Sequence, residues 1–176
     1  MTRFSSAPID WSPFSICKEG EKSPYLRSIQ TFEGLGDRLR FVAFAEKQAA
    51  NAFRLASEIY PDANDEVRSL WIRLAEEEEK HLQLLLDRMK EIGVSPSDRP
   101  QSLDLWKSFD RCNTATEFAK FMASAEDWGM NSGEKFHRTL LGIDPVTAQL
   151  FGRIAAEEKL HIELARKALD SSITNK

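Results

Sequence analysis

Cysteine is scarce in this chain: Cys17 and Cys112 are the only two in 176 residues, and no CxxC pair occurs. Two isolated cysteines exclude a disulfide framework and favour a reducing compartment. The N-terminal residues are interrupted by Pro8, Asp10 and Pro13, and no apolar stretch is long enough for a signal peptide or a membrane span. We therefore expect a cytoplasmic protein with no membrane partner.

The chain also lacks a strong excess of one charge. Its 24 basic and 28 acidic residues give a formal net charge of −4, and the charges are spread along the sequence. Because a nucleic-acid-binding surface requires a basic patch, nucleic acid is not an expected partner. The length is that of one domain, and it is sufficient to bury a sizeable core.

Histidine is the third scarce residue, and two of the three histidines lie in identical motifs. Each is the last residue of a Glu-x-x-His motif, and each motif follows another glutamate by 32 residues. The second set lies 80 residues after the first. Such self-similarity indicates an internal repeat whose unit is one helical hairpin. The six residues are Glu46, Glu78, His81, Glu126, Glu158 and His161.

Apolar residues at helical spacing, bounded by stop and start signals, predict four long helices. Pro61 ends the first helix and Gly93 ends the second. Thr114 opens the third in a capping box, and Pro145 follows an aspartate N-cap at the start of the fourth. The expected helices are 37–60, 65–92, 114–141 and 144–171, with a short helix inside the connection 93–113.

The paired glutamates of each hairpin lie at matching levels, roughly 25 Å from the turn. If a two-fold axis relates the hairpins, all four carboxylates meet at one level. The second and third long helices then run parallel, so the connection must travel the length of the bundle. Residues 1–35 contain scattered aromatic residues, and we expect an arm packed on a bundle formed by 36–172.

Four carboxylates and two imidazoles inside a bundle are costly unless something pairs with them. Two divalent cations balance four carboxylates, and this oxygen-rich set with two histidines suits two iron ions, or manganese, better than zinc. Glu78 and Glu158 each stand among neighbouring glutamates, and each is the one glutamate of its group that lies three residues before a histidine. Glu77 and Glu157 then lie on the adjacent helix face, where they are either solvated or support the ligands.

Simpler explanations exist for each feature alone, since one Glu-x-x-His occurs often by chance and acidic runs are usually solvated faces. His137 lies roughly 16 Å along the helix from Glu126, so we interpret it as a packing or capping residue. The small residues around Glu126 could admit O2, although close helix packing is the preferred interpretation; they include Ala123, Gly129 and Gly133. We expect Trp71 and Trp128 in the core.

With these motifs, the chain resembles the ferritin-like di-iron carboxylate superfamily over about residues 37–171. Residues 125–131 and the Leu105-Trp106 pair are similar to a bacterial ferritin-like family of unassigned function. The resemblance implies an all-α ferritin-like four-helix bundle, made of two hairpins with a long crossover, and a buried di-iron centre that reacts with O2 or peroxide. The six repeated residues match the ligand motif one by one. The chain has neither the rubredoxin-like cysteines of a complete rubrerythrin nor the fifth helix of cage ferritins.

The expected function is that of an oxidoreductase or hydroxylase in which the metal centre itself is catalytic. Glu78 and Glu158 would bridge the two ions, while Glu46 and Glu126 would be terminal ligands. The small-molecule substrate and the reductant are not identified by the sequence, and a homodimer is one expected assembly. Three alternatives stay open: an iron-handling ferroxidase without an organic substrate, a tRNA-modifying hydroxylase of the same fold, and a helical module with a structural metal.

Overall fold

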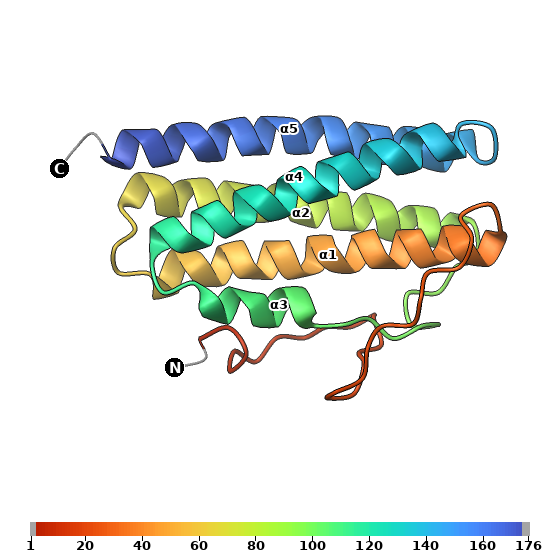
Figure 1. Cartoon of the computed structure of the whole chain (residues 1–176), viewed down its shortest axis with the longest axis horizontal. Helices are drawn as coiled ribbons and strands as arrows, with labels where there is room; N and C mark the ends of the chain where they lie inside the picture. The colour runs from red at the N-terminus through yellow and green to blue at the C-terminus, as the bar shows by residue number, and fades with distance from the viewer. Residues whose placement is uncertain (1–2, 174–176) are drawn as a thin grey trace.

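The computed structural model describes residues 3–173, with side chains described up to residue 163. Its four long helices form the all-α ferritin-like bundle that the sequence predicts (Figure 1). None of the helices in this part of the chain is both long and apolar enough to cross a bilayer. The elements in chain order are α1 (Phe32–Ile59), α2 (Asp65–Glu91), α3 (Asp104–Ser108), the 3-10 helix η1 (Phe109–Arg111), α4 (Ala115–Leu140) and α5 (Pro145–Ile173).

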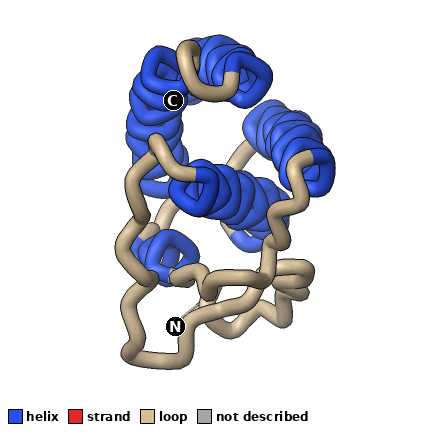
Figure 2. The backbone as a smooth tube through the Cα atoms, turned by 90° about the vertical axis from the view of Figure 1, so that its right-hand side faces the viewer, coloured by secondary structure: helices blue, strands red, loops and turns tan. Residues whose placement is uncertain are grey.

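The helices are arranged as two antiparallel hairpins, α1–α2 and α4–α5, joined by a long crossover. Helices α2 and α4 run in the same direction, and the connection between them, which carries α3 and η1, returns along the outside of the bundle beside α1 (Figure 1). The end-on view shows the N-terminal arm and this connection on the same side of the bundle (Figure 2). The predicted crossover is therefore present.

Side-chain caps fix where the helices begin. The Asn64 Oδ1 accepts a hydrogen bond from the backbone N–H of Val67 at 2.9 Å, as expected for an N-cap. Helix α1 begins at Phe32, five residues before the predicted Asp37, because Thr31 caps it by accepting from the N–H of Gly34. A Cβ at position 34 would lie 1.7 Å from the backbone carbonyl oxygen of Ser28. Gly34 therefore lets the arm pass close to the first turn of α1, and it is not a helix stop.

The core has two clusters, and the arm contributes to both. Phe4 is fully buried in the first cluster, where its ring lies 5.4 Å from Trp106 and 5.7 Å from Phe118. The Trp106 indole N–H also donates to the Phe4 carbonyl at 3.0 Å. Phe14 is buried in the second cluster, whereas Tyr25, further along the arm, is exposed. The division of the chain into 1–35 and 36–172 stays a prediction.

A buried carboxylate ties the arm, helix α1 and the crossover together. Asp37 is 3% exposed and accepts hydrogen bonds of 2.5–3.1 Å from Arg27, Arg40 and Arg99. Burial alone would raise the pKa of Asp37, but contacts with Arg27 and Arg99 lower the pKa from 3.8 to about 2. The arm, helix α1 and the distant crossover thus share one ionised group.

We predict that Asp37→Asn lowers the free energy of unfolding by roughly 3 kcal/mol at pH 7, since it removes the buried carboxylate that pairs with the buried Arg40 and with the more exposed Arg27 and Arg99. The folded-state pKa lies below the ordinary value, so this stabilisation is complete above about pH 4 and is lost as pH falls towards 2. Urea unfolding at several pH values measures both effects. Asp98→Asn is the control, because Asp98 is exposed and forms an ion pair with Arg40 alone, worth less than about 1 kcal/mol. Equal losses in the two variants would contradict the prediction.

Candidate metal centre

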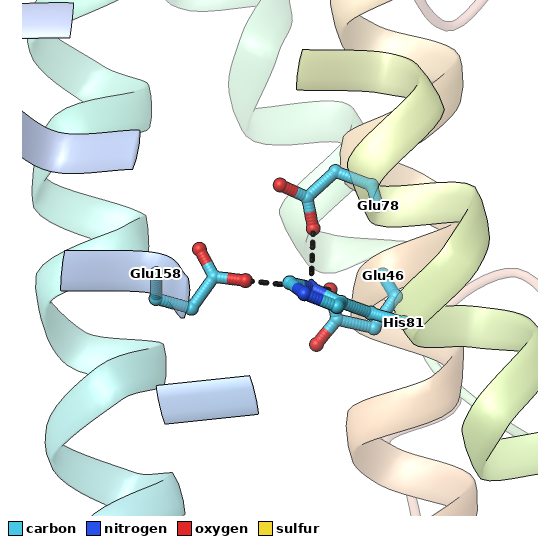
Figure 3. Close-up of side chains that lie close together, drawn as sticks. All are labelled: Glu46, Glu78, His81 and Glu158. Atoms are coloured by element: carbon cyan, nitrogen blue, oxygen red, sulfur yellow. Dashed lines mark ion pairs between the residues drawn. The ribbon is translucent and has the colours of Figure 1, made fainter. Parts of the chain in front are cut away.

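Each of the four long helices contributes an acidic side chain to the space between the hairpins. Ligand atoms of Glu46, Glu78, His81 and Glu158 all lie within 4.8 Å of one another, and all four residues are buried (Figure 3). Glu78 and His81 are the most deeply enclosed, at 1% and 0% exposure. The helices of each hairpin are antiparallel, and the crossover makes α2 and α4 parallel. Together these arrangements place the glutamates at the same height along the bundle, as the repeat spacing predicts.

The other two repeated residues complete the same cluster. The His161 Nδ1 lies 3.3 Å from a Glu158 oxygen and 3.5 Å from a Glu78 oxygen, and the rings of His81 and His161 stack with centroids 5.7 Å apart. Glu126 is half-buried and close enough to Glu158 to interact with its carboxylate. The structure therefore brings all six sequence-predicted residues together, while their role as metal ligands stays a prediction.

Glu78 and Glu158 lie between the two histidines. Glu78 places Oε2 3.7 Å from the His81 Nδ1 and Oε1 3.5 Å from the His161 Nδ1. Glu158 places Oε1 2.9 Å from the His81 Nδ1 and Oε2 3.3 Å from the His161 Nδ1. Glu46 approaches His81, with Oε2 3.7 Å from Nδ1. Glu78 and Glu158 thus each place one oxygen beside each imidazole. Two carboxylates that bridge a pair of ions require this arrangement.

These groups are buried without ordinary hydrogen-bond partners. Among the described residues, seven buried side-chain nitrogen or oxygen atoms have no partner, and six of them belong to this cluster. They are both carboxylate oxygens of Glu78 and Glu158 and the Nδ1 atoms of His81 and His161. Buried polar atoms are almost always satisfied, and a bound ion is one explanation when they are not. Carboxylate oxygens with two imidazole nitrogens form a donor set that fits iron or manganese.

Without a metal, protons must neutralise the four carboxylates. Burial raises the pKa of Glu46, and the adjacent Glu78 raises it further. Burial likewise raises the pKa of Glu126, with the charges of Glu78 and Glu158 adding to the effect. Burial opposes ionisation of Glu78 and Glu158 too, but contacts with the neighbouring acids and the two histidines lower both pKa values. The shifts therefore favour the protonated form of Glu46 and Glu126 and the ionised form of Glu78 and Glu158.

The two histidines hold the balancing charge. Burial disfavours their charged forms, but contacts with the surrounding carboxylates outweigh it and raise the pKa of His81 well above its ordinary value and that of His161 to about 9. These directions favour a metal-free cluster with two imidazolium ions and two carboxylates, an arrangement that is electrically neutral. Two divalent ions that displace the four protons would keep it neutral.

The structure separates two acidic residues that the sequence left equivalent. The His81 Nε2 donates to a Glu157 oxygen at 2.9 Å, and the other Glu157 oxygen accepts from the Arg153 Nε at 2.8 Å. This pair orients the imidazole with Nδ1 towards the central carboxylates, which is how outer carboxylates position metal-binding histidines. Glu77, the repeat equivalent, pairs instead with Lys80 on the surface. The sequence left both residues as either solvated or supporting the ligands, because the deciding contact joins α5 to α2.

The third histidine has a packing role, as predicted. The His137 Nδ1 donates to the Ala148 carbonyl at 2.7 Å, and a Cβ at Gly152 would lie 2.8 Å from that nitrogen. At Gly133 a Cβ would lie 3.2 Å from the Cβ of Ala155, so this glycine permits close packing of α4 on α5, again as preferred from sequence.

The expectation for Trp128 was wrong: its side chain is 59% exposed, edge-on to Phe41 at 5.8 Å. Trp128 is two residues after Glu126, roughly 200° around the helix, so it faces outward. Trp71 is in the core at 3% exposure, as expected.

Four helices that each direct a carboxylate into a shared interior, with two Glu-x-x-His motifs, define a ferritin-like carboxylate bundle of the di-metal type. Residues 37–169 match the family model described as Rubrerythrin. The chain belongs to this family of ferritin-like di-iron carboxylate domains, which implies that it binds iron. No curated protein and no solved structure matches the chain.

We predict that anaerobic titration with Fe²⁺ ends at about two ions per chain and releases roughly four protons at pH 7, because metal ligands must be deprotonated. Since both histidines have raised pKa values, metal affinity should fall as pH is lowered from 9. Calorimetry in buffers of different ionisation enthalpy counts the protons. Glu78→Ala and Glu158→Ala should abolish the transition. An endpoint of one ion per chain, or a preference for zinc in competition, would contradict this prediction.

We further predict that Glu157→Ala weakens Fe²⁺ binding by about 10–100-fold, since it removes the acceptor that orients His81. Competition with a coloured chelator measures the affinity. Glu77→Ala is the matched control, because Glu77 occupies the equivalent position of the other repeat but pairs with Lys80. If both substitutions have the same effect, the hydrogen bond to His81 has no positioning role.

Proposed function

We propose that this protein binds two iron ions between its hairpins and acts as an oxidoreductase on O2 or peroxide. One observation carries the proposal: Glu78 and Glu158 each place one oxygen beside each of the two histidines, with no hydrogen-bond partner for any of these four oxygens among the described residues. Two Fe²⁺ ions held there would supply two electrons, enough to reduce O2 to peroxide or peroxide to water.

The surrounding residues would have distinct tasks in this reaction. Glu78 and Glu158 would hold the ions together, Glu46 would complete the His81 position and Glu126 would complete the His161 position. Glu126 is the one of these four carboxylates that is only half-buried. It is therefore best placed to move or to exchange a proton with solvent. Burial of the other three keeps bulk water away from the electron-transfer site.

The alternatives receive less support from the site. An RNA substrate would require cations near the mouth of the site, but the pocket that reaches Glu126 and His161 has no lysine or arginine among its lining residues. A structural metal site is normally closed, a distinction established for zinc. Six side chains, two of them bridging, leave coordination positions open on two octahedral ions, and this favours a reactive centre.

We predict that the Fe²⁺-loaded protein consumes O2 and gains the near-ultraviolet absorption of Fe³⁺ on stopped-flow mixing with oxygenated buffer. An enzyme should take up no iron beyond two ions per chain, and continued turnover should require a reductant. Glu78→Ala is the negative control. Continued uptake far beyond two ions would instead identify iron storage. A protein that keeps its Fe²⁺ unoxidised in air for hours would have a structural metal.

A further inference from the structure

A separate cleft lies at the end of the bundle where α1 begins and α2 ends (Figure 1). Its volume is about 260 Å³, close to the lower limit of about 300 Å³ for sites that bind small organic molecules. Gly36 lines the cleft, and Glu46 lies ten residues further along α1 (46 − 36 = 10), a separation of roughly 15 Å. None of the six candidate metal ligands is in the lining. Three arginines are, one each from the arm, α1 and the crossover: Arg27, Arg40 and Arg99.

Two of these arginines have hydrogen-bond donors that the protein does not use. A guanidinium group has five N–H donors. The Arg40 side chain is 4% exposed and uses three of them, on one backbone carbonyl and on the carboxylates of Asp37 and Asp98. Arg99 uses two, on Asp37 and on a backbone carbonyl. Two N–H groups of Arg40 (5 − 3) and three of Arg99 (5 − 2) therefore have no partner among the described residues, and the shared contact with Asp37 keeps the two guanidinium groups close together.

The charges around the cleft favour an anion. Asp37 balances one of the three arginines, and Asp98 balances a second through its contact with Arg40. The other acid of the lining, Glu33, is exposed, so solvent screens its charge. The Asp98 side chain is itself 55% exposed, and its carboxylate can turn into solvent when another carboxylate approaches Arg40.

The rest of the lining suits the apolar part of an organic molecule. Phe32 and Val94 contribute apolar side chains, and that of Phe32 is 56% exposed. A Cβ at Gly93 would meet no atom within 4 Å, so the wall is open at this position. A planar guanidinium group binds a carboxylate through two hydrogen bonds and also stacks on aromatic faces. An inorganic anion would leave the apolar wall without a contact, whereas an organic acid uses both parts of the cleft.

We propose that this cleft binds a small organic acid, whose carboxylate pairs with Arg40 and Arg99 and whose apolar part contacts Phe32. The site requires no iron, and it is independent of the function proposed for the metal centre. Its lining brings together the arm, α1 and the crossover, which meet at Asp37. A ligand held there binds the folded chain alone, and it therefore stabilises this junction.

Calorimetric titration of the full-length, metal-free chain with four probes tests the chemical class of the ligand. Benzoate should bind about tenfold or more tightly than benzamide, which has the same ring without the charge. It should exceed acetate, which has the charge without the ring, and inorganic phosphate by a similar factor. Equal affinity for benzoate and any of the other three probes would overturn the assignment of an organic acid. Absence of benzoate binding at millimolar concentration would overturn it too.

Substitutions assign the binding to this cleft. Arg99→Lys keeps the positive charge but loses the planar pair of donors, so benzoate should bind about fivefold or more weakly. Phe32→Ala should also weaken benzoate binding. Its matched control is Tyr25→Ala, which removes an exposed aromatic side chain that is not in the lining and should leave the affinity unchanged. Equal losses in Phe32→Ala and Tyr25→Ala would overturn the assignment.

Asp98→Asn supplies a gain of binding, which a partly unfolded variant would not show. It removes the carboxylate that competes with the ligand for Arg40, so benzoate should bind several-fold more tightly than to the unaltered chain. Unchanged or weaker binding in Asp98→Asn would overturn the proposed position of the carboxylate. Because every measurement uses the metal-free chain, a failure here leaves the proposed function intact, and a failure to oxidise Fe²⁺ leaves this site intact.

Discussion

Four carboxyl groups confined to one buried space are the constraint on which the rest of this protein depends. Ionised together they would repel one another and lose their hydration, so the fold is stable only when positive charge enters the same space. Protons on the glutamates and histidines would supply that charge in the metal-free protein, and divalent ions would supply it in the loaded protein. If two divalent ions replaced four protons, the net charge of the cluster would stay unchanged. The site can therefore load without a large change in the electrostatics of the bundle.

The internal repeat makes the centre symmetric in its ligands but not in its surroundings. Each hairpin contributes one glutamate and one Glu-x-x-His, yet Glu157 contacts His81 while Glu77 pairs with Lys80. An apolar pocket, in turn, is lined by Glu126 and His161. Outer contacts adjust the basicity of a ligand, and apolar walls control what approaches it. The two repeats are therefore equivalent in their candidate ligands and different in the side chains around them.

The arm and the crossover stabilise the bundle from the side opposite the second hairpin. Phe4 fills the first core cluster and Asp37 joins three segments through arginines. Neither feature touches the six ligand candidates. This separation explains how an irregular arm can be retained without affecting the chemistry: it contributes apolar burial and a charge network, whereas the four long helices determine where the glutamates lie.

The sequence by itself determined the helices, the hairpin repeat, the crossover and the six residues of the centre. These depend on local periodicity and on spacing along a helix, which the amino-acid order records directly. Only the tertiary structure decided the role of Glu157, the outward position of Trp128, the burial of Phe4 and the place of the apolar pocket. Each of these depends on which side chain of one helix or segment meets which side chain of another. These contacts are determined by the packing angles of the helices and by residues far apart in the chain, so a local sequence pattern does not predict them.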